Sequence, residues 1–380
     1  MARNTHPSVL VVHNRYRSTG GEERSVELQL AAMGRAGIPH ALHERRSADA
    51  GRAAAAVSML RGGSEESEVA GAVRRLGADV AHFHNVLPLV GPRGLQAAGD
   101  AGAKVVMHLH NVRLYCAIGV GERDGGPCER CRGRNTLPGL RLNCRRSLPE
   151  AAVHAVGLSL HQPRVLATVD RFVAPGAAAA DLLARRGLPR DRIRPLAHYL
   201  PAESFVDGSR AGDGAYALVA SRLSPEKGID TAIEAAAAAG VPLRVAGDGP
   251  DRARLEALAR DSDVEFLGRV ASEGVRGLLA GAAAVLMPSR YHEFSPYSAL
   301  EAMAQGVPVV ATAMGGLPEL LGPGRCTPPG DDAAFAARLA GLWTDPRSRH
   351  AEGEELLGRA RERHGEERYV RDLLELYAAL

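Results

Sequence analysis

The sequence has little lysine, few aromatic residues and no long apolar run. Lysine occurs only as Lys104 and Lys227, and aromatic residues make up 4% of the chain, so its cores must be built from Ala, Val and Leu. No apolar run is long enough to span a bilayer, and the first residues lead into the apolar stretch Val9–Val12 without the pattern of a signal peptide. These absences predict a cytoplasmic protein without a transmembrane segment.

The charge balance and the cysteine count argue against further classes of protein. The net charge of +3 is too small to indicate nucleic-acid binding by itself, and we expect none. Five cysteines in a cytoplasmic chain do not indicate a disulfide framework. A length of 380 residues exceeds one ordinary core and predicts two domains.

Residues 292–310 carry two carboxylates at a predicted junction between a loop and a helix. Ser295 is a good N-cap, and Pro296 fits the first helical position, where no backbone N–H is missed. Glu293 would then lie on the loop before the helix, and Glu301 more than one turn inside it. We expect the helix to end at Gly306.

The chemistry of this junction suggests a particular kind of ligand. The apolar run Val307–Ala311 predicts a buried strand after the helix, despite Pro308 near its start. A helix N-terminus carries partial positive charge and unpaired N–H groups, which suit a phosphate. Two flanking acids would repel a phosphate unless they bind other groups, such as sugar hydroxyls. The pattern therefore predicts a phosphorylated polyol.

Strands and helices alternate regularly along the chain. Residues 79–85 and 105–111 read as successive strands that both end in His-Asn, where the carboxyl ends of parallel strands bind ligands. The pair Gly20-Gly21 lies between a first strand and an amphipathic pattern over Arg24–Met33, and it would let backbone approach a ligand closely. Residues 45–66 indicate a loop with a short helix. The alternation predicts an α/β fold of two doubly wound parallel-sheet domains.

A family resemblance follows from the motifs. The spacing Glu-x7-Glu, followed by Ala302-Met303 and Gly306-Val-Pro-Val-Val310, resembles the retaining glycosyltransferases of the GT-B type, family 4. Ser221–Gly228 is similar to the diphosphate-binding loop of that family, and Gly315–Glu319 to the loop after the motif strand. The resemblance implies two Rossmann-like domains that face a central cleft. The C-terminal domain would bind a nucleotide-diphosphate sugar and the N-terminal domain a hydroxyl acceptor.

The resemblance also implies roles for single residues. The first acid of the motif would contact the donor sugar and the second the nucleotide ribose, and Gly268–Val270 would offer backbone contacts to the base. The implied catalytic residues are His110, Glu293, Arg222 and Lys227. The implied donor-binding residues are Gly20, Gly21, Arg222, Lys227, Gly268, Arg269, Val270, Glu293, Phe294, Ser295, Pro296, Tyr297 and Glu301. The implied acceptor-binding residues are His84, Asn85 and Asn111.

One departure from the family concerns the donor site. Pro296 stands where many members of the family have glycine, so one backbone donor to the sugar is absent. The usual Asn-Gly before the linker is also missing. The resemblance implies a UDP- or GDP-sugar as the donor, and the departure at Pro296 leaves the sugar itself open. The acceptor would be a saccharide, a lipid-linked glycan or a natural product.

A cysteine-containing insertion over residues 112–147 interrupts the first domain. Four thiols with one Cys-x2-Cys pair have the count of an all-cysteine zinc site, whose ligands would be Cys116, Cys128, Cys131 and Cys144. Free thiols or a redox pair remain as alternatives. The insertion also holds several arginines, which could face an acidic acceptor or make peripheral membrane contact, although a solvated face is typical of so arginine-rich a chain.

The sequence thus predicts an enzyme with three segments. Residues 1–198 would form the acceptor-binding domain, residues 212–350 the nucleotide-sugar-binding domain, and residues 351–380 a C-terminal helix that crosses back to the first domain. The reaction would be retaining and would need no metal cofactor, because two cations and a helix N-terminus can stabilise the leaving diphosphate. The alternatives are a sugar-nucleotide epimerase, a phosphorylase of the same fold, or a non-catalytic zinc-containing binding protein.

Overall fold

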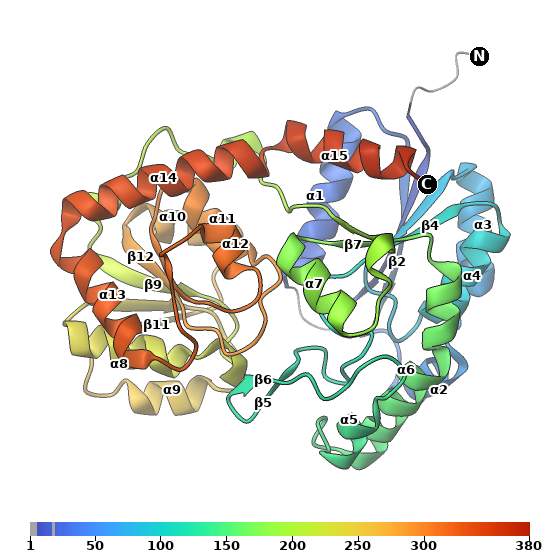
Figure 1. Ribbon diagram of the computed structural model, residues 1–380, viewed down its shortest axis with the longest axis horizontal. Coiled ribbons are helices and arrows are strands. Elements are labelled where there is room, and N and C mark those ends of the chain that lie inside the picture. Colours follow the sequence, from blue (N-terminus) through green and yellow to red (C-terminus); the bar gives the residue numbers. More distant parts are fainter. Residues whose placement is uncertain (1–5, 17–19) are drawn as a thin grey trace. The chain divides into compact units, whose positions relative to one another are not determined.

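A computed structural model describes residues 6–16 and 20–380 of the chain (Figure 1). The chain divides into two compact units. The first unit comprises Met1–Gly121, Glu129–Ala197 and Glu367–Leu380, and the second comprises Glu122–Cys128 and His198–Glu366. The last residues of the chain therefore belong to the same unit as the first.

The first unit is built on a six-stranded parallel sheet. Its strands, in order across the sheet, are β2 (His40–Arg46), β1 (Val9–Arg15), β3 (Val80–Phe83), β4 (Lys104–His108), β7 (Arg171–Ala174) and β8 (Ile193–Pro195). Val9 pairs with His40 on one side and with Val80 on the other. The strand order reverses between β1 and β3, and this point in a doubly wound sheet is where ligands bind.

Helices connect these strands, and a small hairpin belongs to the insertion (Figure 1). The helices of this unit are α1 (Gly21–Arg35), α2 (Arg52–Arg61), α3 (Glu66–Leu76), α4 (Gly91–Asp100), α5 (Leu137–Arg141), α6 (Leu148–Thr168), α7 (Ala177–Arg185) and α15 (Glu366–Ala378). The hairpin, β5 (Glu122–Arg123) with β6 (Gly126–Pro127), is the part of the insertion that belongs to the second unit. The short helix predicted within residues 45–66 is α2, which takes up ten of these residues. Four consecutive alanines in α2 favour helix through propensity where periodicity gives little signal.

The second unit has a six-stranded parallel sheet of its own. Its strands, in order, are β11 (Val264–Gly268), β10 (Leu243–Ala246), β9 (Tyr216–Ala220), β12 (Ala282–Met287), β13 (Val309–Thr312) and β14 (Cys326–Thr327). The order reverses between β9 and β12, so the loops that follow these two strands lie next to each other.

The helices of the second unit build its core against this sheet. They are α8 (Ile229–Ala239), α9 (Arg252–Leu258), α10 (Ser272–Ala280), α11 (Tyr297–Ala304), α12 (Leu317–Leu321), α13 (Asp332–Thr344) and α14 (Pro346–His364). Alternate strand residues such as Ala217 and Val219 pack in one cluster with Ile233 of α8 and Leu339 of α13. The cluster is made mainly of Ala, Val, Leu and Ile, as the scarcity of aromatic residues predicted.

The two sheets confirm the predicted fold class, an α/β protein of two doubly wound Rossmann-like domains. Short 3-10 turns (Arg190–Arg192, Ala202–Ser204, Ala211–Asp213 and Pro225–Lys227) lie between the main elements. None of the helices in the described ranges is long and apolar enough to cross a membrane.

Two expectations about the motif helix need correction. Helix α11 begins at Tyr297, so Pro296 is the N-cap residue, with an extended ψ of 128°, and Ser295 precedes it. The Ser295 carbonyl accepts a hydrogen bond from His198 Nδ1 at 3.0 Å, which holds the chain extended up to this point. Strand β13 starts at Val309, after Pro308, because proline cannot donate to the ladder.

Candidate active site

The loops after β9 and β12 meet at the switch point of the second sheet. Lys227, in the loop after β9, donates from Nζ to Glu293 Oε1 at 2.8 Å, across 66 positions of sequence. Gly228 follows with φ of +64°, and a Cβ there would lie 2.0 Å from the Pro288 carbonyl oxygen. Only glycine allows this close approach of the two loops. The topology of the sheet therefore creates the Lys227–Glu293 pair.

Three side chains hold the carboxylate of Glu293. Its Oε1 accepts from Lys227 Nζ and from Ser289 Oγ at 2.7 Å, and its Oε2 accepts from Tyr291 OH at 2.7 Å. The Glu293 side chain is only 5% exposed. A carboxylate offers about four acceptor positions, so about one remains on Oε2 for a ligand donor.

The electrostatics of this cluster keep Lys227 charged. Burial alone would lower the pKa of Lys227, but the Glu293 carboxylate outweighs burial and holds that pKa above 10.5. Burial raises the pKa of Tyr291, and Glu293 raises it further, so Tyr291 stays a hydroxyl donor. The Lys227 side chain is only 19% exposed. The reason is that its ammonium turns inward to the carboxylate.

Arg222 supplies the exposed cation of the same loop. Its side chain is 57% exposed, and its guanidinium donates to Glu226 Oε1 at 2.5 Å. Ser224 Oγ donates to the same oxygen at 2.8 Å. Burial alone would raise the pKa of Glu226, but these hydrogen bonds and Arg222 lower it, so the carboxylate is ionised and fixes Arg222.

The loop before α11 is held by backbone contacts. Gly315 has φ of +62°, and a Cβ there would lie 2.1 Å from the carbonyl oxygen of Glu293. Gly316 N–H donates to that same carbonyl at 2.6 Å. The ring of His198 stacks on Tyr297 with centroids 4.6 Å apart, and Phe294 is buried. The loop and the first turn of α11 are therefore fixed by their surroundings.

The remaining donor-site residues of the second unit lie on the same sheet edge or in the motif helix. Glu301 lies in the second turn of α11 and is half-buried, as predicted for its position inside the helix. Gly268 ends β11 with φ of +70°, and its carbonyl accepts from Gly247 N–H at 2.7 Å. Arg269 is exposed and Val270 is half-buried in the loop that follows. The contact of Gly268–Val270 with the nucleotide base stays a prediction.

In the first unit, the glycine pair precedes a carboxylate site that the sequence reading missed. Gly20 is the N-cap of α1 and Gly21 its first residue, both exposed. Glu23 Oε2 accepts from Gly20 N–H at 2.8 Å. Glu22 Oε2 accepts from Tyr16 OH at 2.8 Å. Burial raises the pKa of Glu22, so its carboxyl is a better proton acceptor than an exposed one.

A stack of histidines lies at the carboxyl ends of β3 and β4. The rings of His82 and His84 stack with centroids 5.1 Å apart, and those of His108 and His110 with centroids 4.3 Å apart. The ligand atoms of His82, His84 and His108 lie within 4.8 Å of one another. However, imidazole lone pairs lie in the ring plane. The ring of His84 is inclined by only 20° to that of His82 and by 27° to that of His108, so these stacked rings do not direct their lone pairs to one point. The arrangement suits hydrogen bonding better than chelation.

Hydrogen bonds run through this stack to His110. The hydroxyl of Tyr377 in α15 lies 2.8 Å from His82 Nδ1, and burial lowers the pKa of His82 to about 3, so this ring is neutral. Gln29 contacts Tyr377 OH at 3.3 Å, and its Oε1 accepts from His84 Nε2 at 2.9 Å. His84 Nδ1 then accepts from His110 Nε2 at 2.9 Å. The chain of bonds fixes which nitrogen of His110 carries hydrogen.

The predicted acceptor residues line one pocket of the first unit. Its walls comprise Tyr16, Glu22, His84, Asn85, Val86, Leu87, Met107, His108, Leu109, His110, Asn111, Arg113 and Leu114. Asn111 donates to Glu22 at 3.3 Å, and the Arg113 guanidinium lies 4.5 Å from the Tyr16 ring. Asn85 instead donates to the carbonyl oxygens of Asn14 and Leu87, so its side chain holds the loop.

Several residues of these sites escaped the sequence reading. Tyr291 and Ser289 lie within four positions of Glu293, and their proximity was the available signal. Glu22 directly follows the glycine pair, which also marked it. No local pattern connects Gln29 with Tyr377, because they are 348 positions apart.

Zinc binding by the cysteines of the insertion stays a prediction. Cys131 is buried, and its sulfur lies 3.9 Å from the Thr136 carbonyl oxygen. Cys116, Cys128 and Cys144 are half-buried, and so is Cys326 in β14. Burial raises the pKa of Cys326 to about 11, so this thiol stays protonated at neutral pH.

Comparisons with known proteins agree with this geometry. A GDP-mannose-dependent alpha-(1-6)-phosphatidylinositol dimannoside mannosyltransferase of Mycobacterium tuberculosis is 42% identical over 106 residues, 26% of this chain and 28% of that protein. A 2-deoxystreptamine N-acetyl-D-glucosaminyltransferase of Streptomyces fradiae is 32% identical over 239 residues, 52% of this chain and 56% of that protein. The chain thus spans about half or less of the length of these curated relatives.

A solved structure shares the fold of the whole chain. HepE of Anabaena, in complex with UDP and glucose, has a TM-score of 0.67 and 16% identity over 98% of this chain and 100% of its own. The family model of the glycosyl transferases group 1 matches residues 202–356, which contain both loops at the switch point. These comparisons confirm the resemblance at the level of the glycosyl transferases group 1, whose family model matches residues 202–356.

Proposed function

We propose that this protein is a retaining glycosyltransferase of family 4 that moves a sugar from a nucleotide-diphosphate donor to a hydroxyl acceptor. The observation that carries the proposal is the cluster at the switch point of the second sheet. There, Lys227 and Arg222 lie on one loop, and Glu293 lies on the other with three hydrogen-bond donors around it. Cations beside a sugar-orienting carboxylate suit a sugar diphosphate.

The names of related proteins support the class of donor. The mycobacterial relative is named for GDP-mannose, and the HepE structure holds UDP and glucose. We therefore propose a UDP- or GDP-sugar for this chain. Glu301 would bind the ribose, and the Gly268–Val270 segment the base.

The proposed chemistry places charge stabilisation on the protein. The bond between the anomeric carbon and the diphosphate breaks, and negative charge develops on the leaving oxygen. Arg222 and Lys227 would stabilise that charge, with the N–H groups of the first turn of α11. Glu293 would accept a hydrogen bond from a sugar hydroxyl through its remaining position on Oε2. His110 would contact the sugar near its reacting carbon.

The stereochemical proposal follows from the state of Glu293. Its carboxylate already accepts three hydrogen bonds, so it is poorly suited to take the acceptor's proton. The leaving phosphate oxygen can take that proton if the acceptor attacks from the same side. The anomeric configuration would then be retained, and no divalent metal would be needed.

The first unit would bind the acceptor at the pocket lined by Glu22, His84 and Asn111. A carboxylate, an amide and an imidazole together offer the donors and acceptors that a polyol recognises. We also propose that Cys116, Cys128, Cys131 and Cys144 hold a structural zinc ion that orders the insertion.

The alternative enzymes of the same fold receive less support. A phosphorylase that uses pyridoxal phosphate needs a lysine for the Schiff base. Lys227 is the only lysine of the second unit, and its ammonium is engaged by Glu293 and Tyr291. No feature of the described residues favours an epimerase or a non-catalytic binding protein over glycosyl transfer.

The test begins with a thermal-shift screen of UDP- and GDP-sugars, followed by product analysis with the stabilising donor. We expect saturable stabilisation by one class of nucleotide sugar and an α-linked product from an α-linked donor, read from proton NMR couplings. A β-linked product would refute retention. Loss of rate with EDTA that magnesium or manganese restores would refute metal independence.

A further inference from the structure

The exposed apolar side chains of this protein are concentrated on three helices. Eight large hydrophobic residues are exposed in the described part of the chain, and six of them lie on α2, α5 and α6. We call them, together with the exposed arginines of the same segments, the basic apolar face. Its apolar members are 40–58% exposed: Val57, Leu60, Leu137, Leu148, Val156 and Leu160. Scattered single residues need no explanation, but a concentration of this kind marks a contact surface.

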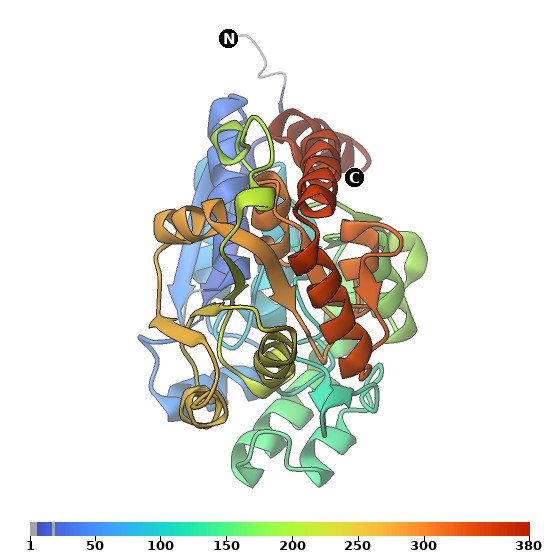
Figure 2. The ribbon, with the colours of Figure 1, turned by 90° about the vertical axis from the view of Figure 1, so that its left-hand side faces the viewer.

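The three helices are neighbours within the first unit. Both ribbon views show α5 and α6 side by side in green (Figures 1 and 2). His161 of α6 has its Nε2 2.8 Å from the carbonyl oxygen of Leu60 in α2. A Cβ on Gly157 of α6 would lie 2.8 Å from the Met59 carbonyl oxygen, so the two helices cross closely. The exposed side chains of α2 and α6 therefore flank one helix crossing.

Helix α6 is apolar on both its inner and its outer side. Its buried residues, including Ala155, Leu158 and Val165, pack inward. Its outer side carries Val156 and Leu160, which are four residues apart and share a face. Glu150 and Arg164 are the only acidic or basic residues among its 21 positions, histidine aside. A surface helix normally has a polar outer face, so the outer face of α6 is suited to an apolar surrounding.

Arginine accompanies these apolar residues. Residues 51–63 and 129–168 contain nine arginines, no lysine and only two acidic residues, whereas the whole chain has a net charge of +3. Arg141 follows Leu137 by four positions on α5, and Arg164 follows Leu160 by four positions on α6, so each pair shares a helix side. Both arginines are exposed. The positive charge is thus placed beside the apolar side chains.

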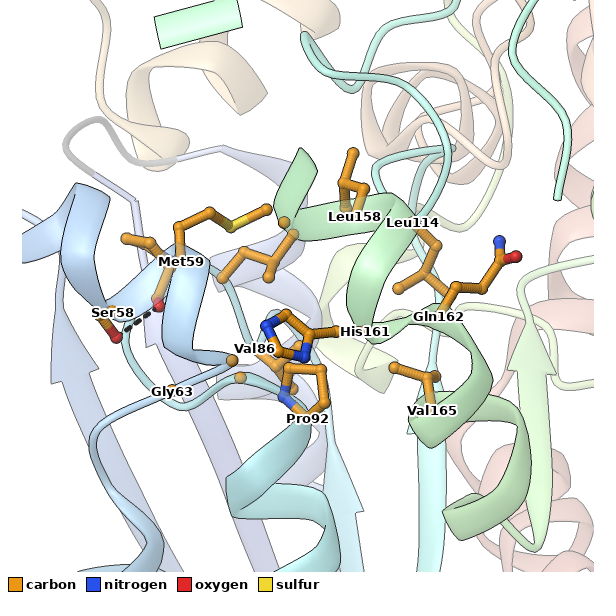
Figure 3. Close-up of a pocket in the computed structure, with 15 residues that line it drawn as sticks. Ser58, Met59, Gly63, Val86, Pro92, Leu114, Leu158, His161, Gln162 and Val165 are labelled. Atoms are coloured by element: carbon orange, nitrogen blue, oxygen red, sulfur yellow. Dashed lines mark hydrogen bonds between the residues drawn. The ribbon is translucent and has the colours of Figure 1, made fainter. Parts of the chain in front are cut away.

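An apolar recess lies between the same helices (Figure 3). Its empty space is about 410 Å³, and α2 contributes Met59 to its wall while α6 contributes Leu158 and Val165. His161 and Gln162 are the polar side chains that Figure 3 shows on the α6 side. The recess adds apolar surface next to the exposed face.

We propose that the basic apolar face docks on the surface of an anionic lipid bilayer. Exposed leucine and valine enter the boundary between headgroups and acyl chains, and neighbouring arginines reach the lipid phosphates. A second copy of this chain would bring two arginine-rich faces together, which repel. Nucleic acid would match the charge, but these two segments contain no aromatic residue for base stacking and expose aliphatic side chains instead. An anionic bilayer matches both features.

The test is co-sedimentation of the full chain with sucrose-loaded vesicles. We expect binding to vesicles of phosphatidylcholine mixed with phosphatidylglycerol, much weaker binding to phosphatidylcholine alone, and loss of binding at high salt. The variant Val156→Ser/Leu160→Ser should bind about tenfold more weakly because it loses exposed apolar area. Arg141→Glu/Arg164→Glu should lower the affinity by about tenfold or more because it reverses two charges.

Matched controls separate this face from general effects. Leu258→Ser removes a leucine of α9 that is 40% exposed, and Arg276→Glu reverses an exposed arginine on α10. Both control variants should bind vesicles like the parent. Circular dichroism would show that all variants are folded. No binding to anionic vesicles overturns the proposal, and so does an equal loss in the control variants. A lipid-free dimer in sedimentation velocity that Val156→Ser/Leu160→Ser dissociates would assign the face to a second copy instead.

Discussion

Replacing Lys227 by methionine should expose how strongly the switch-point cluster depends on its one buried cation. Lys227 Nζ is 2.8 Å from Glu293 Oε1 and 2.9 Å from Tyr291 OH, and both charged side chains are largely buried. Methionine keeps the length of the side chain and its apolar contacts. The substitution therefore removes the charge and leaves a buried carboxylate with two neutral donors.

The expected cost follows from that uncompensated charge. Breaking a buried ion pair by removing one partner costs about 3–5 kcal/mol. Ser289 and Tyr291 still donate to Glu293, so we expect the lower end, about 3 kcal/mol. For a unit of this size, that corresponds to a fall of about 6–12 °C in Tm. Glu293 holds the pKa of Lys227 above 10.5. The stabilisation that the Lys227–Glu293 ion pair gives the folded state is therefore fully present at neutral pH and is lost only as pH rises through this raised pKa.

The assay is a double-mutant cycle on the full chain. Lys227→Met, Glu293→Gln and their combination are compared by thermal and denaturant unfolding. We expect the double variant to be more stable than the sum of the single effects, with a coupling of about 2 kcal/mol, because it buries no net charge. A Lys227→Met variant with an unchanged Tm, or strictly additive effects, would refute the reasoning.

Four other outcomes are expected. Arg222→Ala should lose about 3 kcal/mol of transition-state stabilisation, measured as a lower kcat with saturating donor. Its Tm should not change, since the Arg222 side chain is exposed, and a near-normal kcat would contradict the proposed role. Burial raises the pKa of Glu22, so the folded state loses stability as pH rises from about 4.5 through that raised pKa. The difference in Tm between Glu22→Gln and the parent should therefore grow in favour of the variant between about pH 4 and pH 8. A difference that does not change with pH would show that the pKa of Glu22 is not raised. Tyr377→Phe should cost about 1 kcal/mol in unfolding and shift the pH profile of kcat, whereas a purely structural hydroxyl would move only the first. Metal analysis should find about one zinc per chain, unchanged in Cys326→Ser; no zinc, with four alkylatable thiols in the native protein, would exclude a site formed by Cys116, Cys128, Cys131 and Cys144.

Local sequence features determined the strands and the order of the helices. Strands β3 and β13 lie in or overlap the segments 79–85 and 307–311 that predicted them, because a buried parallel strand has a continuous apolar sequence between turn residues. The motif over residues 292–310 identified Glu293 and Glu301 by spacing alone. Errors were confined to boundaries such as the start of α11, where the fixed dihedral of Pro296 suits either the N-cap or the first helical turn.

Only the tertiary structure decided what these residues contact. The pairing of Lys227 with Glu293 depends on a strand order that places β9 beside β12, and sequence spacing carries no record of that order. The bonds from Tyr377 through Gln29 to the histidine stack join the two ends of the chain. The exposed outer side of α6 likewise follows from which side packs inward, since both sides are apolar in sequence. Periodicity and propensity act between near neighbours, whereas burial and ion pairing depend on segments that meet only after folding.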